Sequence, residues 1–334
     1  MAFADRSFDF RPPGGAMAPL SPRQCHRARA QDAFATGWTA LGPNRFLVRA
    51  AWPREHPFFT PLGGRVHDPL LIVETMRQSA MAVLHAAFGV PLGHHFLLTG
   101  IDYACHPRHL APGNGPGPGA ADADDADGAE VELVFPELKY RGGHLSQLLV
   151  QWTVRRGGAV AATGTGLCRI TAPQVYRRLR GPHTAPVSHH PAAPPVRAAL
   201  AGRTRPADVL LTPAGRAGTW ELLADTRHPT LFQRPGDHIP GMLLLEAARQ
   251  AACAAAGPDP FLPQRGAVSF HRYAEFDTPC VLQAAAMPAP GGARVVRVTG
   301  HQGGAPVFLC TLAGPGPGAA ATRTRRPAAV PAAR

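Results

Sequence analysis

Residues 69–88 combine an almost continuous apolar character with a narrow polar stripe. The apolar side chains cover most of the circumference of a helix, and the polar positions between them include Glu74, Arg77 and Gln78. Positions i, i+3 and i+4 lie on one face of a helix, so these three residues form a single stripe. A helix that is apolar nearly all round is buried. The pattern therefore predicts a buried helix that presents a carboxylate, a guanidinium and an amide side by side.

The same stripe occurs a second time in the stretch "GMLLLEAARQAA", residues 241–252. The aligned pairs, at one offset of 172 residues and without a gap, are His56 with His228, Pro57 with Pro229, Glu74 with Glu246, Arg77 with Arg249, and Gln78 with Gln250. Self-similarity at a fixed spacing indicates a repeated structural unit. The chain therefore consists of two copies of one domain.

A second match fixes how the copies differ in length. The Gly-Gly pair at 157–158 corresponds to the pair at 303–304 at an offset of 146, which is 26 residues shorter than the first offset. A segment of Gly, Pro, Ala and Asp with a single Asn in the first copy accounts for most of the excess. The predicted parts are an N-terminal extension (1–24), a first repeat (25–178) with a disordered insertion (111–128), a mobile Pro-rich linker without core residues (179–204), a second repeat (205–313) and a disordered tail (314–334).

Each copy has the same order of predicted elements. Strands come first, at 33–41 and 45–52 and again at 217–224, followed by a loop, the long helix, and strands of alternating polarity with Gly-Gly hairpin turns. Asp68-Pro69 is a favourable helix start, because Asp caps free amides and Pro suits the first turn. One long helix against an antiparallel sheet, made twice, is an α+β architecture.

The amino-acid composition indicates the class of protein and the kind of partner to expect. The chain of 334 residues has 45% hydrophobic and 17% charged residues, as globular proteins do, and its net charge of +12 favours acidic partners. The six cysteines are widely spaced, which favours a reduced, cytoplasmic protein. No signal-peptide core and no run of about 20 apolar residues is present, so no membrane association is expected.

The stripe has two interpretations. It could be a solvated helix edge, where a Glu/Arg pair contributes only a few tenths of a kcal/mol. It could also be a buried site, because an enclosed carboxylate costs several kcal/mol unless it is paired, and such a group is usually kept for a specific reason. Recurrence in both copies decides little, since duplication copies structural and functional features alike.

The helix motifs resemble the hotdog fold, in which a curled antiparallel sheet wraps a long central helix. The tandem stretches "HDPLLIVETMRQ" (67–78) and "DHIPGMLLLEAARQ" (237–250), with "FGVPLGHHFLLTGIDY" (88–103), resemble the A-factor biosynthesis hotdog-repeat family. The likeness covers roughly residues 25–105 and 205–313. It implies a tandem double hotdog with two central helices.

The resemblance also implies an activity. Members of that family are γ-butyrolactone synthases, which transfer a β-ketoacyl group from an acyl-carrier-protein thioester to a hydroxyl of dihydroxyacetone phosphate. The ester then condenses to a butenolide phosphate. The acidic and basic helix positions of the family fall on Glu74, Glu246 and Arg249.

A neighbouring hotdog family, the β-hydroxyacyl carrier-protein dehydratases, pairs a helix Glu with a His fourteen residues before it. Here those positions are Thr60 and Phe232, neither of which abstracts a proton as imidazole does. His56 and His228 lie eighteen residues before their glutamates and would need a different loop path. Dehydration is therefore the weaker hypothesis.

Acyl transfer to a hydroxyl needs a base, an oxyanion site and a grip on the acceptor. Glu74 or Glu246, with a pKa raised by burial, is the candidate base, and Arg249 is the candidate phosphate ligand because guanidinium binds phosphate in a bidentate fork. The helix N-termini near Pro69 and Gly241 are candidate oxyanion sites. The remaining candidate substrate-binding residues are Arg77, Gln78, Gln250 and Gly241.

Other chemistries find little support. His67, His106 and His109 are explained by a helix cap and loops, so no metal ion and no cofactor are expected. The arginines form no stripe with aromatic residues, which argues against nucleic acid. The expected partners are an acidic acyl carrier protein or acyl-CoA and dihydroxyacetone phosphate, with the chain as a monomeric pseudo-dimer or a homodimer. The alternatives are a non-catalytic acyl- or butenolide-binding regulator, a dehydratase and a thioesterase.

Overall fold

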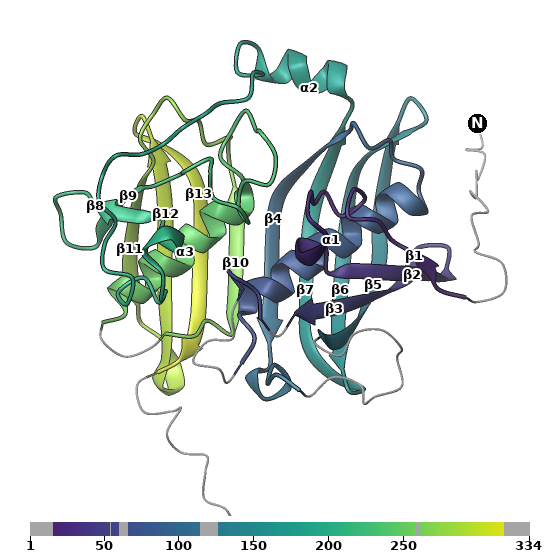
Figure 1. Cartoon of the computed structure of the whole chain (residues 1–334), viewed down its shortest axis with the longest axis horizontal. Helices are drawn as coiled ribbons and strands as arrows, with labels where there is room; N and C mark the ends of the chain where they lie inside the picture. Colours follow the sequence, from purple (N-terminus) through teal and green to yellow (C-terminus); the bar gives the residue numbers. More distant parts are fainter. Residues whose placement is uncertain (1–15, 54, 60–65, 114–125, 258–260, 317–334) are drawn as a thin grey trace, which may run out of the picture.

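The molecule consists of two similar halves that lie side by side, each with one long helix across a curled antiparallel sheet (Figure 1). The computed structural model describes residues 16–53, 55–59, 66–113, 126–257 and 261–316. Because the same order of elements occurs in both halves, the predicted duplication and the α+β architecture are confirmed. The arrangement is that of a double hotdog.

One antiparallel sheet of thirteen strands runs through both halves. Its strands in the first repeat are β1 (Ala18–Pro19), β2 (Ala35–Gly42), β3 (Arg45–Pro53), β4 (His95–Cys105), β5 (Ala126–Arg141), β6 (His144–Arg156) and β7 (Ala159–Thr171). Those in the second repeat are β8 (Leu211–Pro213), β9 (Thr219–Leu222), β10 (Arg265–Phe270), β11 (Val281–Met287), β12 (Ala293–Gln302) and β13 (Ala305–Pro315). The spatial order is β1-β2-β3-β5-β6-β7-β4-β10-β13-β12-β11-β9-β8. The repeats are joined where β4 pairs with β10, with Ile101 opposite Val268.

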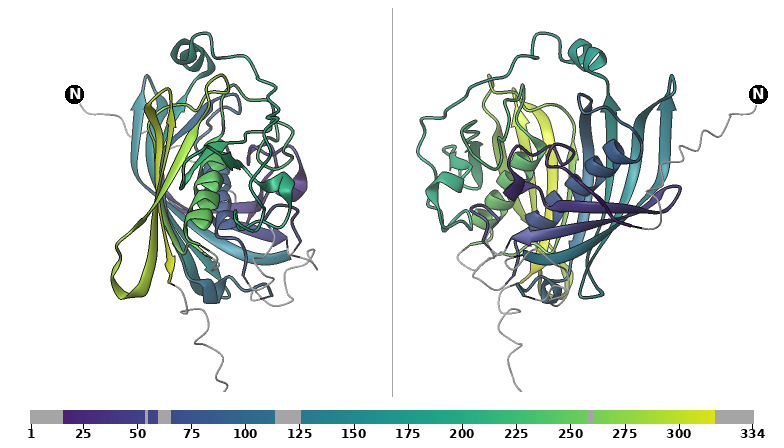
Figure 2. Two further views of the ribbon diagram at one scale, coloured as in Figure 1. Left: turned by 90° about the vertical axis from the view of Figure 1, so that its left-hand side faces the viewer. Right: turned by 45° about the vertical axis from the view of Figure 1, so that its right-hand side comes forward.

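The two long helices, α1 (Pro69–Ala86) and α3 (Gly241–Ala255), lie on the same face of the sheet (Figure 2). The start of α1 is the predicted one, because the Asp68 side chain accepts a hydrogen bond from the amide of Leu70 at 2.9 Å and Pro69 occupies the first turn. The helix ends two residues before the predicted Phe88, ahead of Gly89 in a left-handed conformation. Leu71, Ile72, Val73 and Met76 are enclosed completely, as the all-round apolar pattern requires.

The hairpin turns also follow the sequence prediction. Gly157 and Gly158 connect β6 to β7, and Gly303 and Gly304 connect β12 to β13, all with positive φ. Two consecutive residues with positive φ make the type I′ turn, whose twist matches that of the strands it joins. The second repeat offset therefore corresponds to equivalent hairpins.

The Pro-rich segment between the repeats is not the mobile tether that was predicted. A short helix, α2 (Pro173–Arg180), leads into this segment and lies at the top of the molecule in Figure 1. Downstream, the Val187 amide donates to the Gly236 carbonyl at 2.9 Å, and both Ala201 and Arg203 are buried. The prediction that this segment carries no core is wrong, because it packs along the second repeat and supplies an enclosed arginine.

Other predicted boundaries shift slightly. The predicted insertion overlaps the first residues of β5, and β13 extends into the predicted tail as far as Pro315. Residues 1–15, 114–125 and 317–334 lie outside the described part of the chain. Short 3₁₀ helices occur at Ala30–Asp32, Pro107–His109, Pro206–Asp208 and Pro290–Gly292. All six cysteines are free and buried. None of the helices in the described ranges has the length and apolar character to cross a membrane.

Candidate functional site

The polar stripe of α1 is enclosed, so the interpretation as a solvated helix edge is wrong. Glu74 has no exposed surface. Arg77 donates to its two carboxylate oxygens at 2.8 and 2.7 Å, and Gln78 donates at 2.6 Å. A further guanidinium, that of Arg27, donates through Nε at 2.9 Å. The carboxylate is thus surrounded by donors, two of which are cationic.

The stripe of α3 repeats this arrangement. Glu246 is also fully buried and accepts from Arg249 at 2.8 and 2.6 Å and from Gln250 at 2.7 Å. Its second cation is Arg203, which donates through Nε at 2.7 Å. A buried charge that meets two opposite charges and several donors avoids the cost of isolation. Each repeat therefore contains one carboxylate held by two arginines.

Sequence comparison at the single offset of 172 missed Arg27 and Arg203. Both belong to a repeated pattern Arg-x-Arg-x-x-Asp, at 27–32 and 203–208, whose offset is 176. Aligning the two segments with a gap of four residues reveals them. Each arginine also reaches the opposite repeat: Nη1 of Arg27 donates to the carbonyl of Thr230 at 3.1 Å, and that of Arg203 donates to the carbonyl of Phe58 at 2.8 Å.

The two glutamines of the stripes hold these arginine segments in place. The Gln78 amide donates to the Asp32 carbonyl at 2.8 Å and accepts from the Phe34 amide at 2.7 Å. Gln250 makes the equivalent pair of contacts with the backbone of Asp208 and Leu210. Both side chains are buried. Because their amides are engaged with backbone, they position the site and do not face a ligand.

The histidines His56 and His228 are loop anchors. Nδ1 of His56 accepts from two backbone amides at 3.0 and 3.1 Å, and Nε2 lies 2.8 Å from Asp32. His228 likewise accepts from two backbone amides, and its Nε2 lies 3.5 Å from Asp208. Both rings are buried. They stabilise the loops that precede the helices and do not substitute for a dehydratase histidine.

The expected raised pKa of the two glutamates is wrong. Burial acts to raise the pKa of Glu74, but the charges of Arg27 and Arg77 and their hydrogen bonds outweigh it and lower the pKa to about 2. Burial acts in the same way on Glu246, whose pKa Arg203 and Arg249 lower to about 2. Both carboxylates are therefore ionised at neutral pH and are poor proton acceptors.

The two clusters differ in access to solvent. A cavity of about 930 Å³ between the repeats is lined by Glu74, Arg27 and Arg77. Glu246 also borders this cavity, but neither of its arginines does. The side chain of Arg77 is 23% exposed, whereas that of Arg249 is 2% exposed. The first cluster is open to a ligand and the second is closed.

The charges of the clusters differ as well. Arg234 enters the first cluster, and burial followed by the nearby charges of Arg77 and Arg27 lowers its pKa. No carboxylate in the described residues pairs with Arg234; it donates instead to Nδ1 of His26 at 2.8 Å. In the second cluster Asp68 lies 3.6 Å from Arg203. At the cavity, three guanidiniums thus face one carboxylate. In the closed cluster, two guanidiniums face two carboxylates.

The N-termini of the two helices are also unequal. Asp68 caps α1, so its carboxylate already occupies the position of a bound anion. No side chain within the described residues caps α3, and both Gly241 and Met242 line the cavity. A Cβ on Gly241 would lie 3.2 Å from the ring of Phe270, so glycine fits this close approach. Of the two candidate oxyanion sites, the N-terminus of α3 remains available.

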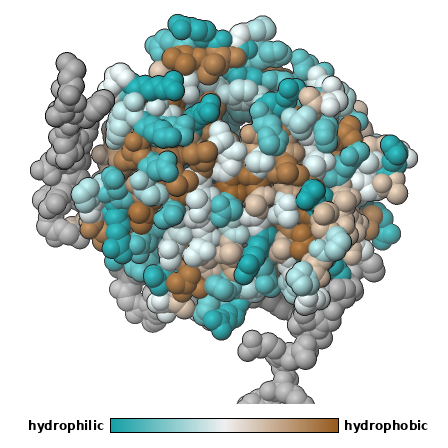
Figure 3. All heavy atoms as spheres, turned by 180° about the vertical axis from the view of Figure 1, so that it is seen from behind, coloured by the Kyte–Doolittle hydropathy of each residue, from teal (hydrophilic) through white to brown (hydrophobic). Residues whose placement is uncertain are grey.

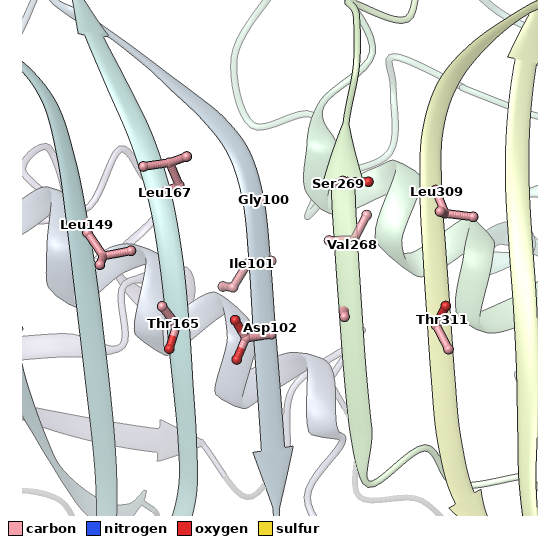
Figure 4. Close-up of a pocket in the computed structure, with 11 residues that line it drawn as sticks. Gly100, Ile101, Asp102, Leu149, Thr165, Leu167, Val268, Ser269, Leu309 and Thr311 are labelled. Carbon is pink, nitrogen blue, oxygen red and sulfur yellow. The ribbon is translucent and has the colours of Figure 1, made fainter.

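Figure 3 shows the opposite face of the sheet, where apolar side chains gather near the middle. A second hollow, of about 410 Å³, lies on this face over the junction of β4 and β10 (Figure 4). Figure 4 shows Leu149, Leu167 and Leu309 with Asp102 on the side away from the helices. Leu167 and Leu309 are partly exposed. The hollow holds one titratable side chain and has no cluster of polar groups, so the cavity between the repeats is the candidate site. In the described parts of the chain, no group of three or more His, Cys, Asp or Glu is arranged to hold a metal ion.

Comparison with known proteins agrees with this architecture. The family model of the A-factor biosynthesis hotdog domain matches residues 9–172 and 184–313. The 2-oxo-3-(phosphooxy)propyl 3-oxoalkanoate synthase of Streptomyces coelicolor is 53% identical, with 89% of this chain and 92% of that protein covered. Proteins of the same name from Streptomyces griseus and Streptomyces virginiae are 49% and 41% identical, each over 89% of this chain and over 96% and 98% of their own lengths. Among solved structures, the 12:0-ACP thioesterase from Umbellularia californica is 12% identical with a TM-score of 0.49, covering 80% of this chain and 93% of that one. From the family model and these relatives, the chain belongs to the A-factor biosynthesis hotdog family.

Proposed function

We propose that this protein is an acyltransferase that moves a β-ketoacyl group from a thioester to a hydroxyl of dihydroxyacetone phosphate. The product is a 2-oxo-3-(phosphooxy)propyl 3-oxoalkanoate, the ester that appears in the names of the related synthases. In this ester an acidic methylene lies between two carbonyls, and the ketone of the glycerone half is the electrophile. Ring closure with loss of water then gives the butenolide phosphate.

The observation that carries the proposal is the excess of positive charge at the cavity. Arg27 and Arg77 share one carboxylate, and Arg234 has no carboxylate partner in the described residues. Guanidinium groups bind phosphate through paired, charge-assisted hydrogen bonds. Burial and then repulsion from Arg77 and Arg27 lower the pKa of Arg234, and a phosphate dianion would relieve that repulsion. We therefore assign the acceptor phosphate to these three arginines.

Glu74 has a different role from the predicted one. Because its pKa is held at about 2, it stays ionised and fixes the orientation of Arg27 and Arg77. Arg249 was the predicted phosphate ligand, but its guanidinium is enclosed and bonded to Glu246. We assign a structural role, the support of the site, to four residues: Glu246, Arg249, Gln78 and Gln250. Among the predicted substrate ligands, we assign direct contact with the phosphate only to Arg77.

The donor side of the reaction uses the N-terminus of α3. The free amides of Gly241 and Met242 are suited to the thioester oxygen, on which negative charge develops during attack. Apolar side chains, including Phe58, Phe59 and Met81, line the cavity and suit an acyl chain. Arg169, Arg177 and Arg272 line the same cavity. Their charge fits an acidic carrier protein, and equally the phosphates of coenzyme A.

The experiment measures thiol release from a β-ketoacyl thioester with and without acceptor. We expect release with dihydroxyacetone phosphate, and much less with dihydroxyacetone, because only the phosphate engages the arginines. Release without any acceptor would identify a thioesterase instead. Binding of the thioester without release under either condition would indicate a non-catalytic binding protein.

A further inference from the structure

A second polar group faces the same cavity, on the loop that leads into α3. Nδ1 of His238 lies 2.6 Å from a carboxylate oxygen of Asp237, and both residues line the cavity. The His238 side chain is 30% exposed and that of Asp237 is 12% exposed. His238 lies three residues before Gly241, which begins α3. A carboxylate–imidazole pair therefore adjoins the candidate oxyanion site.

Asp237 is fixed by α2, the short helix that leads into the linker. The Tyr176 hydroxyl lies 2.9 and 2.8 Å from its two oxygens, and Arg180 contacts both its side chain, at 3.3 Å, and its carbonyl, at 2.9 Å. Arg180 is in turn held by Glu275 at 2.5 and 2.9 Å. Burial acts to raise the pKa of Asp237, but the His238 ring, Tyr176 and Arg180 hold it below its usual value. The aspartate is an ionised, immobile hydrogen-bond acceptor.

This environment fixes the orientation of the imidazole. An ionised aspartate can only accept, so Nδ1 of His238 carries the proton and donates. The lone pair of neutral imidazole then belongs to Nε2, which makes no hydrogen bond within the described residues. The ring packs at its edge against Tyr273, at 4.9 Å between centroids. The Tyr273 hydroxyl is buried and has no hydrogen-bond partner in the described part of the chain, although it too lines the cavity.

The pair is absent from the other repeat. At the offset of 172 residues, Asp237 and His238 correspond to Arg65 and Val66. If the pair only supported the loop, a duplicated loop could be expected to keep it, as both loops keep their anchoring histidines His56 and His228. The Asp237–His238 pair is therefore associated with the open cavity and is not a feature common to both repeats.

We propose that His238 is the general base of the acyl transfer and that Asp237 positions it. The inference rests on the proposed function. Nε2 takes the proton of the acceptor hydroxyl as its oxygen bonds to the thioester carbonyl carbon. The tetrahedral intermediate then collapses, the C–S bond breaks, and the proton on Nε2 passes to the leaving sulfur. Thioester and alcohol become ester and thiol, with no other reactant. Tyr176 and Arg180 act through Asp237 and are positioning residues.

The test uses His238→Asn in the full-length chain, because the asparagine amide can still donate to Asp237 while Nε2 is lost. We expect kcat to fall by roughly 10²- to 10⁴-fold, the usual range for a lost general base, while KM for dihydroxyacetone phosphate changes less than about threefold, since the phosphate ligands remain. Asp237→Asn retains the shape of the side chain and is expected to lower kcat by at least about tenfold.

A matched control exists outside the cavity. His190 of the linker pairs with Asp225 of the second repeat at 3.1 Å, and neither residue lines the cavity, so His190→Asn should leave kcat unchanged. Thermal unfolding establishes that each variant is folded; if His238→Asn is not, Asp237→Asn decides. Wild-type kcat in the folded variants would overturn the role of His238 alone. No acceptor-dependent thiol release by the wild type would overturn the proposed function and this role with it.

Discussion

The Glu74 and Glu246 clusters have the same connectivity but opposite surroundings. In both, a helix glutamate binds the arginine three residues later and a second arginine from the Arg-x-Arg-x-x-Asp segment. At Glu246, Asp68 compensates the second arginine, and the group is closed to solvent. At Glu74, Arg234 adds a positive charge and the group opens to the cavity. Duplication has left one copy of the cluster enclosed within the fold and one copy open at the cavity.

The asymmetry extends to the backbone. His26 precedes Arg27 with a φ of 56° and is the only residue other than glycine with positive φ in the described ranges; Gly202, with a φ of 63°, precedes Arg203. Both repeats therefore use a left-handed turn here. Such a conformation costs a side chain roughly 1–2 kcal/mol, and it is often retained at functional sites. The open copy keeps histidine, whose ring contacts Arg234 and His85, at 2.8 Å in each case.

The largest predicted effect separates the clusters by stability. Glu246→Gln removes the charge between two enclosed guanidiniums, so we expect a loss of about 3–5 kcal/mol in the free energy of unfolding. Glu74→Gln should cost less, because Arg77 is partly exposed and water can hydrate it. Urea denaturation of both variants measures the difference. Equal losses would show that the two clusters do not differ in solvent access.

A smaller effect is expected for the extra cation of the open cluster. Removing one charged hydrogen bond to phosphate costs roughly 1.5–3 kcal/mol, so Arg234→Ala should raise KM for dihydroxyacetone phosphate by about 10- to 100-fold. Its thermal midpoint should stay near that of the wild type, because Arg234 pairs with no carboxylate among the described residues and its removal relieves repulsion from Arg27 and Arg77. Arg178 is exposed on α2 and does not line the cavity, so Arg178→Ala is the matched control. An unchanged KM in Arg234→Ala would place the phosphate elsewhere.

The smallest effect concerns the left-handed turns. His26→Gly relieves the strained backbone but increases the freedom of the unfolded chain, so the free energy of unfolding should change by less than about 1 kcal/mol. KM for the acceptor should rise only a few-fold, because Arg234 loses one contact. Gly202→Ala tests the closed copy, where a Cβ would lie 3.1 Å from the Cys253 sulfur and 3.2 Å from Nη1 of Arg249. A clear destabilisation is expected only for Gly202→Ala, and a comparable loss in His26→Gly would show that the histidine supports the fold.

The local pattern of residues along the chain was sufficient to predict the duplicated fold. The all-round apolar helices, the Asp68 cap and the Gly-Gly hairpins each express a rule that acts within a few residues, and the structure confirms all three. The polar stripes were also visible, since spacing alone places Glu74 beside Arg77. The pKa shifts of the glutamates were not visible in the sequence. The direction of each shift depends on Arg27 or Arg203, which come from distant segments.

The amino-acid sequence by itself determined that there are two repeats, where the buried helices lie and which residues form the stripes. Only the tertiary structure decided which stripe is open, that Arg234 joins Arg27 and Arg77, and that α2 holds Asp237. The physical reason is the distance along the chain over which each interaction acts. Helix caps, turns and amphipathic spacing depend on neighbours along the chain, whereas solvent access and net charge at a site depend on segments that meet only when both repeats have folded against each other.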